Sequence, residues 1–228
     1  MLMKTKVLSV LLFIIGSVFI FTEYHSSFLP GTVIKALIIP VLMILFLVNL
    51  RLRHNLLHRL MFAGLFFSWS GDLILELSHS NGDMFIAGLA CFLLAHVMYL
   101  TVFFKTPGKN VTFHHRIYLL IPVILYGVGL VYYLYDDLAE MRFPVILYAI
   151  VILTMLTGAI NRIEKANSYS YYLVLAGAIL FVISDSAIAI NKFSHHFESS
   201  AIMIMSTYII AQYLIVLGYI KQFRENPE

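Results

Sequence analysis

The chain contains 228 residues, of which 61% are hydrophobic and 12% are charged. A soluble domain typically has roughly 45–50% apolar and about 25% charged residues, so the composition excludes an ordinary water-soluble domain. The net charge of +3 is too small to indicate nucleic-acid binding, and the single cysteine, Cys91, excludes an intramolecular disulfide and a cysteine-based metal cluster. We therefore expect one membrane-embedded unit that uses no metal and no other cofactor.

Eight runs of about 18 or more residues with few charges follow one another along the chain. They lack the alternation of polar and apolar residues that membrane strands show, so we expect helices. Each run is long enough to cross a hydrocarbon core about 30 Å thick. The expected fold class is an all-α integral membrane protein with a single transmembrane domain and helices at 7–24, 32–50, 60–77, 84–104, 117–134, 143–160, 171–190 and 201–220.

The basic residues predict the orientation of these helices. If the N-terminus is cytoplasmic, all 15 Lys and Arg residues except Lys35, Arg142 and Lys192 fall in segments on the cytoplasmic side. Because cytoplasmic loops are enriched in Lys and Arg, both termini are predicted to be cytoplasmic. This bias and the absence of a recognisable targeting signal fit a bacterial inner membrane. The loops are short, so any active site is expected among the helices.

A short internal repeat accompanies the helix pattern. Ala63-Gly64 precedes Asp72 and Ala176-Gly177 precedes Asp185, and each Asp follows its Gly by eight residues. The two helices concerned run in the same direction across the membrane. We therefore expect two parallel repeats of four helices, covering about residues 1–110 and 111–228.

Asp72 and Asp185 are the two acidic residues that fall well inside predicted helices. A carboxylate within a membrane costs about 2.5–3.5 kcal/mol on the insertion scale, so it usually faces the bundle interior and has a function or a partner. Each Asp lies five residues from the outer end of its helix, about 7–8 Å below the exterior boundary. The acids are therefore expected at one level, either as a reactive pair or as polar contacts between helices.

Residues on the same side of the membrane extend this candidate site. Lys35 is about 4–5 Å deep, from where its side chain reaches either acid or extends to the headgroups. Gly64, Ser68, Asp72 and Glu76 recur every four residues and form a stripe that should face neighbouring helices, with Glu76 as a solvated helix end.

Two further helices present polar residues. His96 and Tyr99 share one face of the helix at 84–104, and Tyr208 and Gln212 lie on the helix at 201–220. His96 lies near the midplane, which favours a packing role. No G-x-S-x-G or Ser-x-x-Lys motif is present, which disfavours a serine hydrolase. The candidate substrate-binding residues are Lys35, Ser68, Tyr148 and Asn191.

Four segments together resemble a known family. They are Lys35-Ala-Leu-Ile-Ile-Pro40, Gly64-Leu-Phe-Phe-Ser-Trp-Ser-Gly-Asp72, Phe85 through His96 to Tyr99, and Gly177 through Asp185 to Phe193. In this order and spacing they resemble the YhhN-type family of eight-helix membrane proteins, whose animal members are lysoplasmalogenases. The resemblance covers nearly the whole chain. It implies hydrolysis of the vinyl ether of a lysoplasmalogen to a fatty aldehyde and a glycerophospho-alcohol, with Asp72 and Asp185 as the catalytic pair.

The chemistry of this reaction suits two carboxyl groups. A vinyl ether is hydrolysed by protonation of its β-carbon, attack of water on the resulting oxocarbenium-like carbon, and collapse of the hemiacetal. The reaction needs an acid and a base but no nucleophile, so one protonated and one ionised carboxyl group are sufficient. The same division of labour operates in glycosidases. The expected partners are a lysophospholipid substrate and the bilayer.

Two other functions remain open from the sequence. Paired membrane acids and a lysine also suit a proton-coupled transporter, although the expected repeats are parallel and no Gly/Pro-broken helix pair occurs at matched positions. A non-catalytic lipid-binding protein is the third alternative. It would require that both acids be dispensable.

Overall fold

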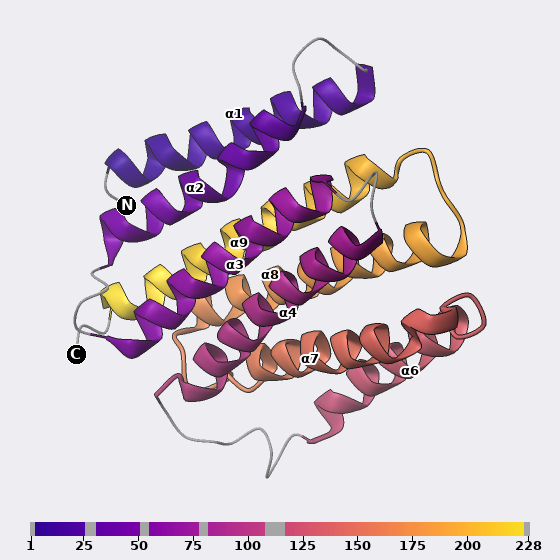
Figure 1. Cartoon of the computed structure of the whole chain (residues 1–228). Helices are drawn as coiled ribbons and strands as arrows, with labels where there is room; N and C mark the ends of the chain where they lie inside the picture. Colours follow the sequence, from indigo (N-terminus) through magenta and orange to yellow (C-terminus); the bar gives the residue numbers. More distant parts are fainter. Residues whose placement is uncertain (1–2, 26–30, 51–54, 78–81, 108–116, 226–228) are drawn as a thin grey trace. The chain divides into compact units, whose positions relative to one another are not determined.

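The described part of the chain is helical. The structure is a computed structural model that describes residues 3–25, 31–50, 55–77, 82–107 and 117–225. Within these ranges the chain forms eight α-helices and no strand (Figure 1). It divides into two compact units, Met1–Tyr99 and Leu100–Glu228.

The first unit is built from four helices, the last of which continues beyond the unit. Their bounds are α1 (Met3–His25), α2 (Gly31–Asn49), α3 (Leu56–Leu77) and α4 (Gly82–Lys105). α1 packs against α2, and α2 packs against α3. A Cβ on Gly71 of α3 would lie 2.6 Å from the ring of Phe92 on α4, so this glycine is what lets the ring approach the helix.

The second unit contains the remaining helices. They are η3 (Ile117–Leu120), α6 (Ile121–Leu134), η4 (Ala139–Met141), α7 (Arg142–Ile160), α8 (Ser168–Ala189), the π-helical segment η5 (Ile190–Ser194) and α9 (Ser200–Glu225). α6 packs against α7, α7 against α8, and α8 against α9. α8 begins at a side-chain cap, because Oδ1 of Asn167 accepts a 2.7 Å hydrogen bond from the backbone N–H of Ser170.

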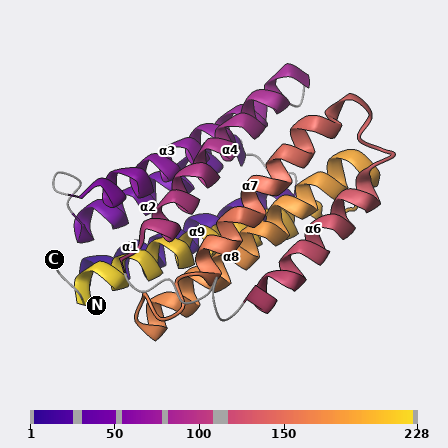
Figure 2. The same ribbon diagram turned by 90° about the horizontal axis from the view of Figure 1, so that it is seen from below.

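Two glycines bring α8 and α9 close together, and the helices lie side by side in both views (Figure 1, Figure 2). A Cβ on Gly177 of α8 would lie 2.8 Å from the backbone oxygen of Ala211 on α9. A Cβ on Gly218 of α9 would lie 3.0 Å from the backbone oxygen of Ser170, whose hydroxyl donates a 2.7 Å hydrogen bond to the Gly218 carbonyl. Small residues allow such approach between membrane helices. This contact holds α8, the helix that carries Asp185, against α9.

The predicted helices are confirmed, with boundaries that differ by a few residues at most of their ends. Among the described residues, seven helices are long and apolar enough to span a membrane, and α3 is not one of them. An eighth membrane span at α3 stays a prediction. The two parallel four-helix repeats and the cytoplasmic position of both termini stay predictions. Of the basic residues used to orient the helices, Arg51, Arg53, Lys109 and Arg116 lie outside the described residues.

Two of the basic residues assigned to the cytoplasmic side are packed inside the protein. Arg162, just after α7, is 1% exposed, and its Nη2 donates a 2.9 Å hydrogen bond to Oγ of Ser170. Its guanidinium carbon lies 5.7 Å from the centroid of the Phe103 ring. Burial lowers the pKa of Arg162 to about 10 and also lowers the pKa of Lys165. These cations are therefore part of the packed structure between α7 and α8.

Candidate active site

Residues 184–186 join three helices at the end of α8. The hydroxyl of Ser184 donates a 3.0 Å hydrogen bond to the backbone oxygen of Ile204 on α9. On the other side, the hydroxyl of Tyr126 on α6 donates a 2.8 Å hydrogen bond to Oγ of Ser186. Because consecutive helical residues point about 100° apart, three neighbours in sequence reach three different helices. The residue between the two serines is Asp185.

Asp185 is bonded to the third helix, α7. The hydroxyl of Tyr148 donates a hydrogen bond of 2.5 Å to Oδ2 of Asp185, and both side chains are half-buried. Hydrogen bonds from a hydroxyl to a carboxylate are typically about 2.5–2.7 Å long, shorter than those between neutral groups. The structure thus places Tyr148, a predicted substrate-binding residue, directly on the carboxylate. Its bond fixes the orientation of that group.

A small cavity lies beside this pair. It has a volume of about 50 Å³ and is lined by Tyr148, Asp185 and Ser186 together with mostly apolar side chains of α6, α7 and α8. A single water needs about 10–15 Å³ and two to four polar partners. The cavity therefore has room for a water molecule or a small polar group of a substrate next to the carboxylate.

Tyr208 and Gln212 lie in the interface between α8 and α9. They are 3% and 0% exposed, and Nε2 of Gln212 is 3.4 Å from the Tyr208 hydroxyl. The Tyr208 ring packs edge-on against Phe181 of α8, with centroids 5.5 Å apart. Phe181 precedes Asp185 by one helical turn. The two α9 residues thus pack against the part of α8 that leads into the site.

Asn191 lies in η5 and fixes the connection to α9. Its Oδ1 accepts a 3.3 Å hydrogen bond from the backbone N–H of Phe197. The predicted role of Asn191 in substrate binding stays a prediction. The contact that the structure gives for its amide oxygen is structural.

In the first unit, Asp72 lies on a buried stripe of α3. Asp72 is 4% exposed and Ser68, one turn earlier, is fully buried. One further turn back, a Cβ on Gly64 would clash with the ring of Tyr99 on α4. Tyr99 and His96 are both fully buried. The predicted stripe is confirmed as a buried face up to Asp72, and Oγ of Ser68 has no hydrogen-bond partner within the described ranges.

Lys35 pairs with Glu76. Its Nζ lies 3.1 Å from Oε2 of Glu76, and Thr32 of α2 donates a 3.0 Å hydrogen bond to the other carboxylate oxygen. The Glu76 side chain is 21% exposed. The expectation that Glu76 is a solvated helix end is therefore wrong, because two side chains of α2 bind it. The pair was not predicted from the sequence, although the nearby depths of the two residues were a signal that could have indicated it.

Asp72 and Asp185 belong to different units, so their pairing stays a prediction. The bond between Tyr126 and Ser186 could not be predicted, because aromatic residues are common throughout the predicted helices. Within its own unit, each Asp lies eight residues after a glycine that packs against the following helix: Gly64 contacts α4 and Gly177 contacts α9.

Comparison with known proteins identifies relatives over most of the chain. A family model described as the YhhN family matches residues 31–219. The chain is 32% identical over 171 residues to lysoplasmalogenase TMEM86A of Bos taurus. The aligned region covers 73% of this chain and 67% of that protein. It is 25% identical over 164 residues to a lysoplasmalogenase of Mycobacterium tuberculosis, covering 71% and 60%, respectively. No solved structure matches the chain significantly.

Proposed function

The chain belongs to the YhhN family, and from this premise we propose that it is a membrane-embedded hydrolase that cleaves the vinyl ether bond of lysoplasmalogens. The products are a fatty aldehyde and a glycerophospho-alcohol. The observation that carries the proposal is Asp185, which is hydrogen-bonded by Tyr148 beside a cavity among apolar helices, in a chain whose relatives are named lysoplasmalogenases.

In the proposed mechanism, one carboxyl group protonates the β-carbon of the vinyl ether and the other activates water. Water adds to the oxocarbenium carbon, and the hemiacetal collapses to the aldehyde and the released alcohol, so that one water is consumed per bond cleaved. Because Tyr148 donates a hydrogen bond to Asp185, we assign the base to Asp185 and the acid to Asp72. The cavity beside Asp185 is the proposed place of the attacking water.

Ser68 and Lys35 are the proposed binding groups of the first unit. The buried hydroxyl of Ser68, one turn from Asp72, suits a hydroxyl or ether oxygen of the substrate. Lys35 suits the phosphate as a point charge, but Glu76 already neutralises it. We therefore propose that Ser68 contributes more to binding than Lys35 does.

The test is an assay of purified protein with a lysoplasmalogen, with a saturated alkyl-ether lysolipid of the same headgroup as the control. We expect aldehyde only from the vinyl ether. Asp72→Asn and Asp185→Asn should each reduce turnover by about 10²–10⁴-fold, because each removes a proton donor or acceptor without changing its shape. Near-normal turnover in either variant, at an unchanged melting temperature, would contradict the paired-acid mechanism.

Oxygen labelling distinguishes which bond breaks. A single-turnover reaction in H₂¹⁸O, with the aldehyde trapped by borohydride before it exchanges, should place solvent oxygen in the trapped alcohol. Pre-formed unlabelled aldehyde serves as the exchange control. Heavy oxygen in the glycerophospho product instead would mean attack on the glyceryl side of the ether, and would exclude the assigned roles of Asp72 and Asp185.

A further inference from the structure

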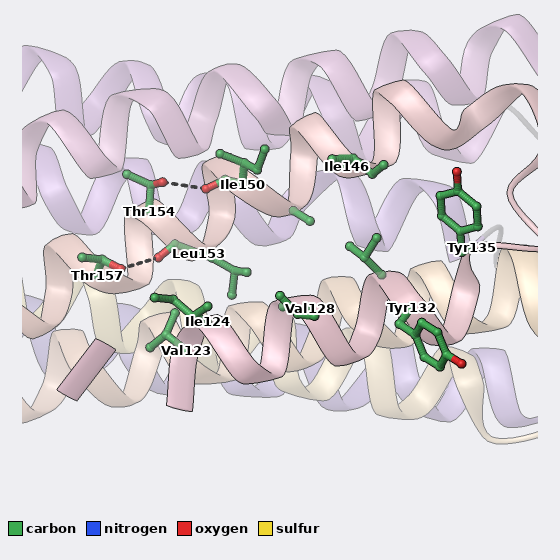
Figure 3. Close-up of a pocket in the computed structure, with 13 residues that line it drawn as sticks. Val123, Ile124, Val128, Tyr132, Tyr135, Ile146, Ile150, Leu153, Thr154 and Thr157 are labelled. Carbon is green, nitrogen blue, oxygen red and sulfur yellow. Dashed lines mark hydrogen bonds between the residues drawn. The ribbon is translucent and has the colours of Figure 1, made fainter. Parts of the chain in front are cut away.

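An apolar groove runs along the surface between α6 and α7 of the second unit (Figure 3). Its volume is about 760 Å³, within the range of roughly 300–1,000 Å³ typical of small-molecule sites. Val123, Ile124 and Val128 line it from α6, and Ile146 and Ile150 line it from α7. Ile124 and Val128 are 59% and 63% exposed, so the groove is open along one side.

The threonine hydroxyls that line the groove do not make its wall polar. The hydroxyl of Thr154 donates a 2.6 Å hydrogen bond to the backbone oxygen of Ile150, and that of Thr157 donates a 2.9 Å bond to Leu153, as Figure 3 shows. Both hydroxyls are thus satisfied within α7. The groove presents methyl and methylene groups at this end, which suits a hydrocarbon chain.

The opposite end of the groove is aromatic. Figure 3 shows Tyr132 and Tyr135 at this end, away from Thr154 and Thr157. Tyr132 is 85% exposed. Tyrosines with one apolar and one polar part are typical of the level of lipid headgroups. The groove therefore runs from an interfacial end into the apolar depth of the membrane.

The groove adjoins the cavity that contains Asp185. Four residues line both spaces, namely Gly127, Val131, Ala149 and Leu153. At Gly127 the wall has no side chain of its own, and Leu153 lies where a Cβ would be. A lipid chain in the groove would therefore be separated from the Asp185 carboxylate by one layer of side chains.

We propose that this groove binds the alkenyl chain of the lysolipid and brings the vinyl ether to Asp185. The inference rests on the proposed function and names the part of the protein that selects the alkenyl chain of the substrate. From Val131, next to the cavity, to Val123 at the deep end is eight residues, or about 12 Å along α6. One leaflet of a hydrocarbon core is about 15 Å thick. The groove thus matches one lipid chain that descends from the headgroup level.

A second apolar groove supplies the matched control. It has a volume of about 450 Å³ and is lined by Leu175, Ile179 and Ile183 of α8 together with residues of α6 and α7. It shares Tyr126 and Val182 with the cavity, where Tyr126 is held by its bond to Ser186. Ile179 is 43% exposed and lines only this second groove among these spaces.

The first test compares Ile124→Trp with Ile179→Trp on lysoplasmalogens of short and long chain. A Trp at position 124 should fill the deep end of the α6–α7 groove. We expect kcat/KM for the long chain to fall at least about tenfold while that for the short chain changes less than about twofold. Ile179→Trp should leave the ratio of the two unchanged. The opposite pattern, or an equal loss for both chains in Ile124→Trp at unchanged melting temperature, would overturn the proposal.

The second test does not depend on turnover. A lysolipid with a diazirine at the end of its chain is photolysed with the full-length Asp185→Asn protein in vesicles of phosphatidylcholine, and the labelled peptides are identified by mass spectrometry. We expect labelling near Ile124, Thr154 and Thr157, which line only the α6–α7 groove among these spaces, with displacement by unlabelled lysolipid. The proposal would be overturned by labelling centred on Ile179, by equally good displacement with excess diacyl lipid, or by cross-linked dimers through α6. If the enzyme assay alone fails, specific labelling still supports the groove.

Discussion

The hydrogen bond from Tyr148 to Asp185 is the best-defined interaction of the candidate site. A hydrogen bond to a charged group contributes roughly 1.5–3 kcal/mol. Since the bond orients the carboxylate and Tyr148 does not line the α6–α7 groove, its loss should impair the chemical step more than substrate binding.

We therefore expect Tyr148→Phe to lower kcat by about 10–100-fold with KM changed little. Tyr133→Phe is the control, because the Tyr133 hydroxyl accepts a 3.1 Å hydrogen bond from Ser194 at the exposed end of α6 and lies outside the cavity lining. Steady-state kinetics on both variants check the prediction. A rise in KM alone would assign Tyr148 to substrate binding.

For single residues, the sequence predicted depth and burial better than it predicted hydrogen-bond and ion-pair partners. Helix periodicity and distance from the helix ends placed Asp72 and Lys35 at nearby depths, but depth does not fix the direction in which a side chain points. Lys35 is therefore predicted within reach of Asp72 or Asp185, whereas the structure pairs it with Glu76. The bond from Tyr148 to Asp185 depends on how α7 packs against α8, which no pattern within either helix contains.

α8 packs closely against α9, because Gly177 faces the backbone of α9. Sequence patterns predicted the helix but not the closeness of this contact. The glycine of Ala176-Gly177 was recognised only as part of a repeat.

Gly177→Ala should destabilise the protein by about 1–3 kcal/mol, because the new Cβ would lie 2.8 Å from a backbone oxygen that cannot rotate away. Gly129→Ala on α6 is the matched control. Its Cβ would meet no atom within 4 Å, and alanine is favoured over glycine in helices by about 1 kcal/mol. Thermal unfolding in detergent should lower the melting temperature of the first variant only; equal melting temperatures would refute the close contact.

The basic residues predict how the whole molecule is oriented in the membrane. Arg162 and Lys165 weaken that argument in one respect, because they are 1% and 8% exposed and pack within the protein. A charge count treats them as loop cations, since burial is not visible in the sequence. The bias persists without them, because the exceptions are still Lys35, Arg142 and Lys192.

Reporters fused after Glu228 should therefore read as cytoplasmic, and reporters inserted at Asp137, between α6 and α7, should read as exterior. Paired alkaline phosphatase and fluorescent-protein fusions measure both sides in one host. An exterior signal from the C-terminal fusion would reverse the level assigned to Asp185 and the direction of the chain in the α6–α7 groove.

The π-helical segment η5 lies between Asp185 and the loop that leads to α9. A change in the length of that loop therefore does not alter the geometry at Asp185. In η5 the N–H of His195 bonds the oxygen of Ile190 at 3.1 Å, five residues back instead of four. Such a turn holds one residue more than an α-helical turn. Deletion of one residue there would close an ordinary α-helical turn and shift only residues C-terminal to η5, because all of α8 precedes it. Insertions and deletions among relatives should thus accumulate at 190–194, while the spacing from Gly177 to Asp185 stays fixed.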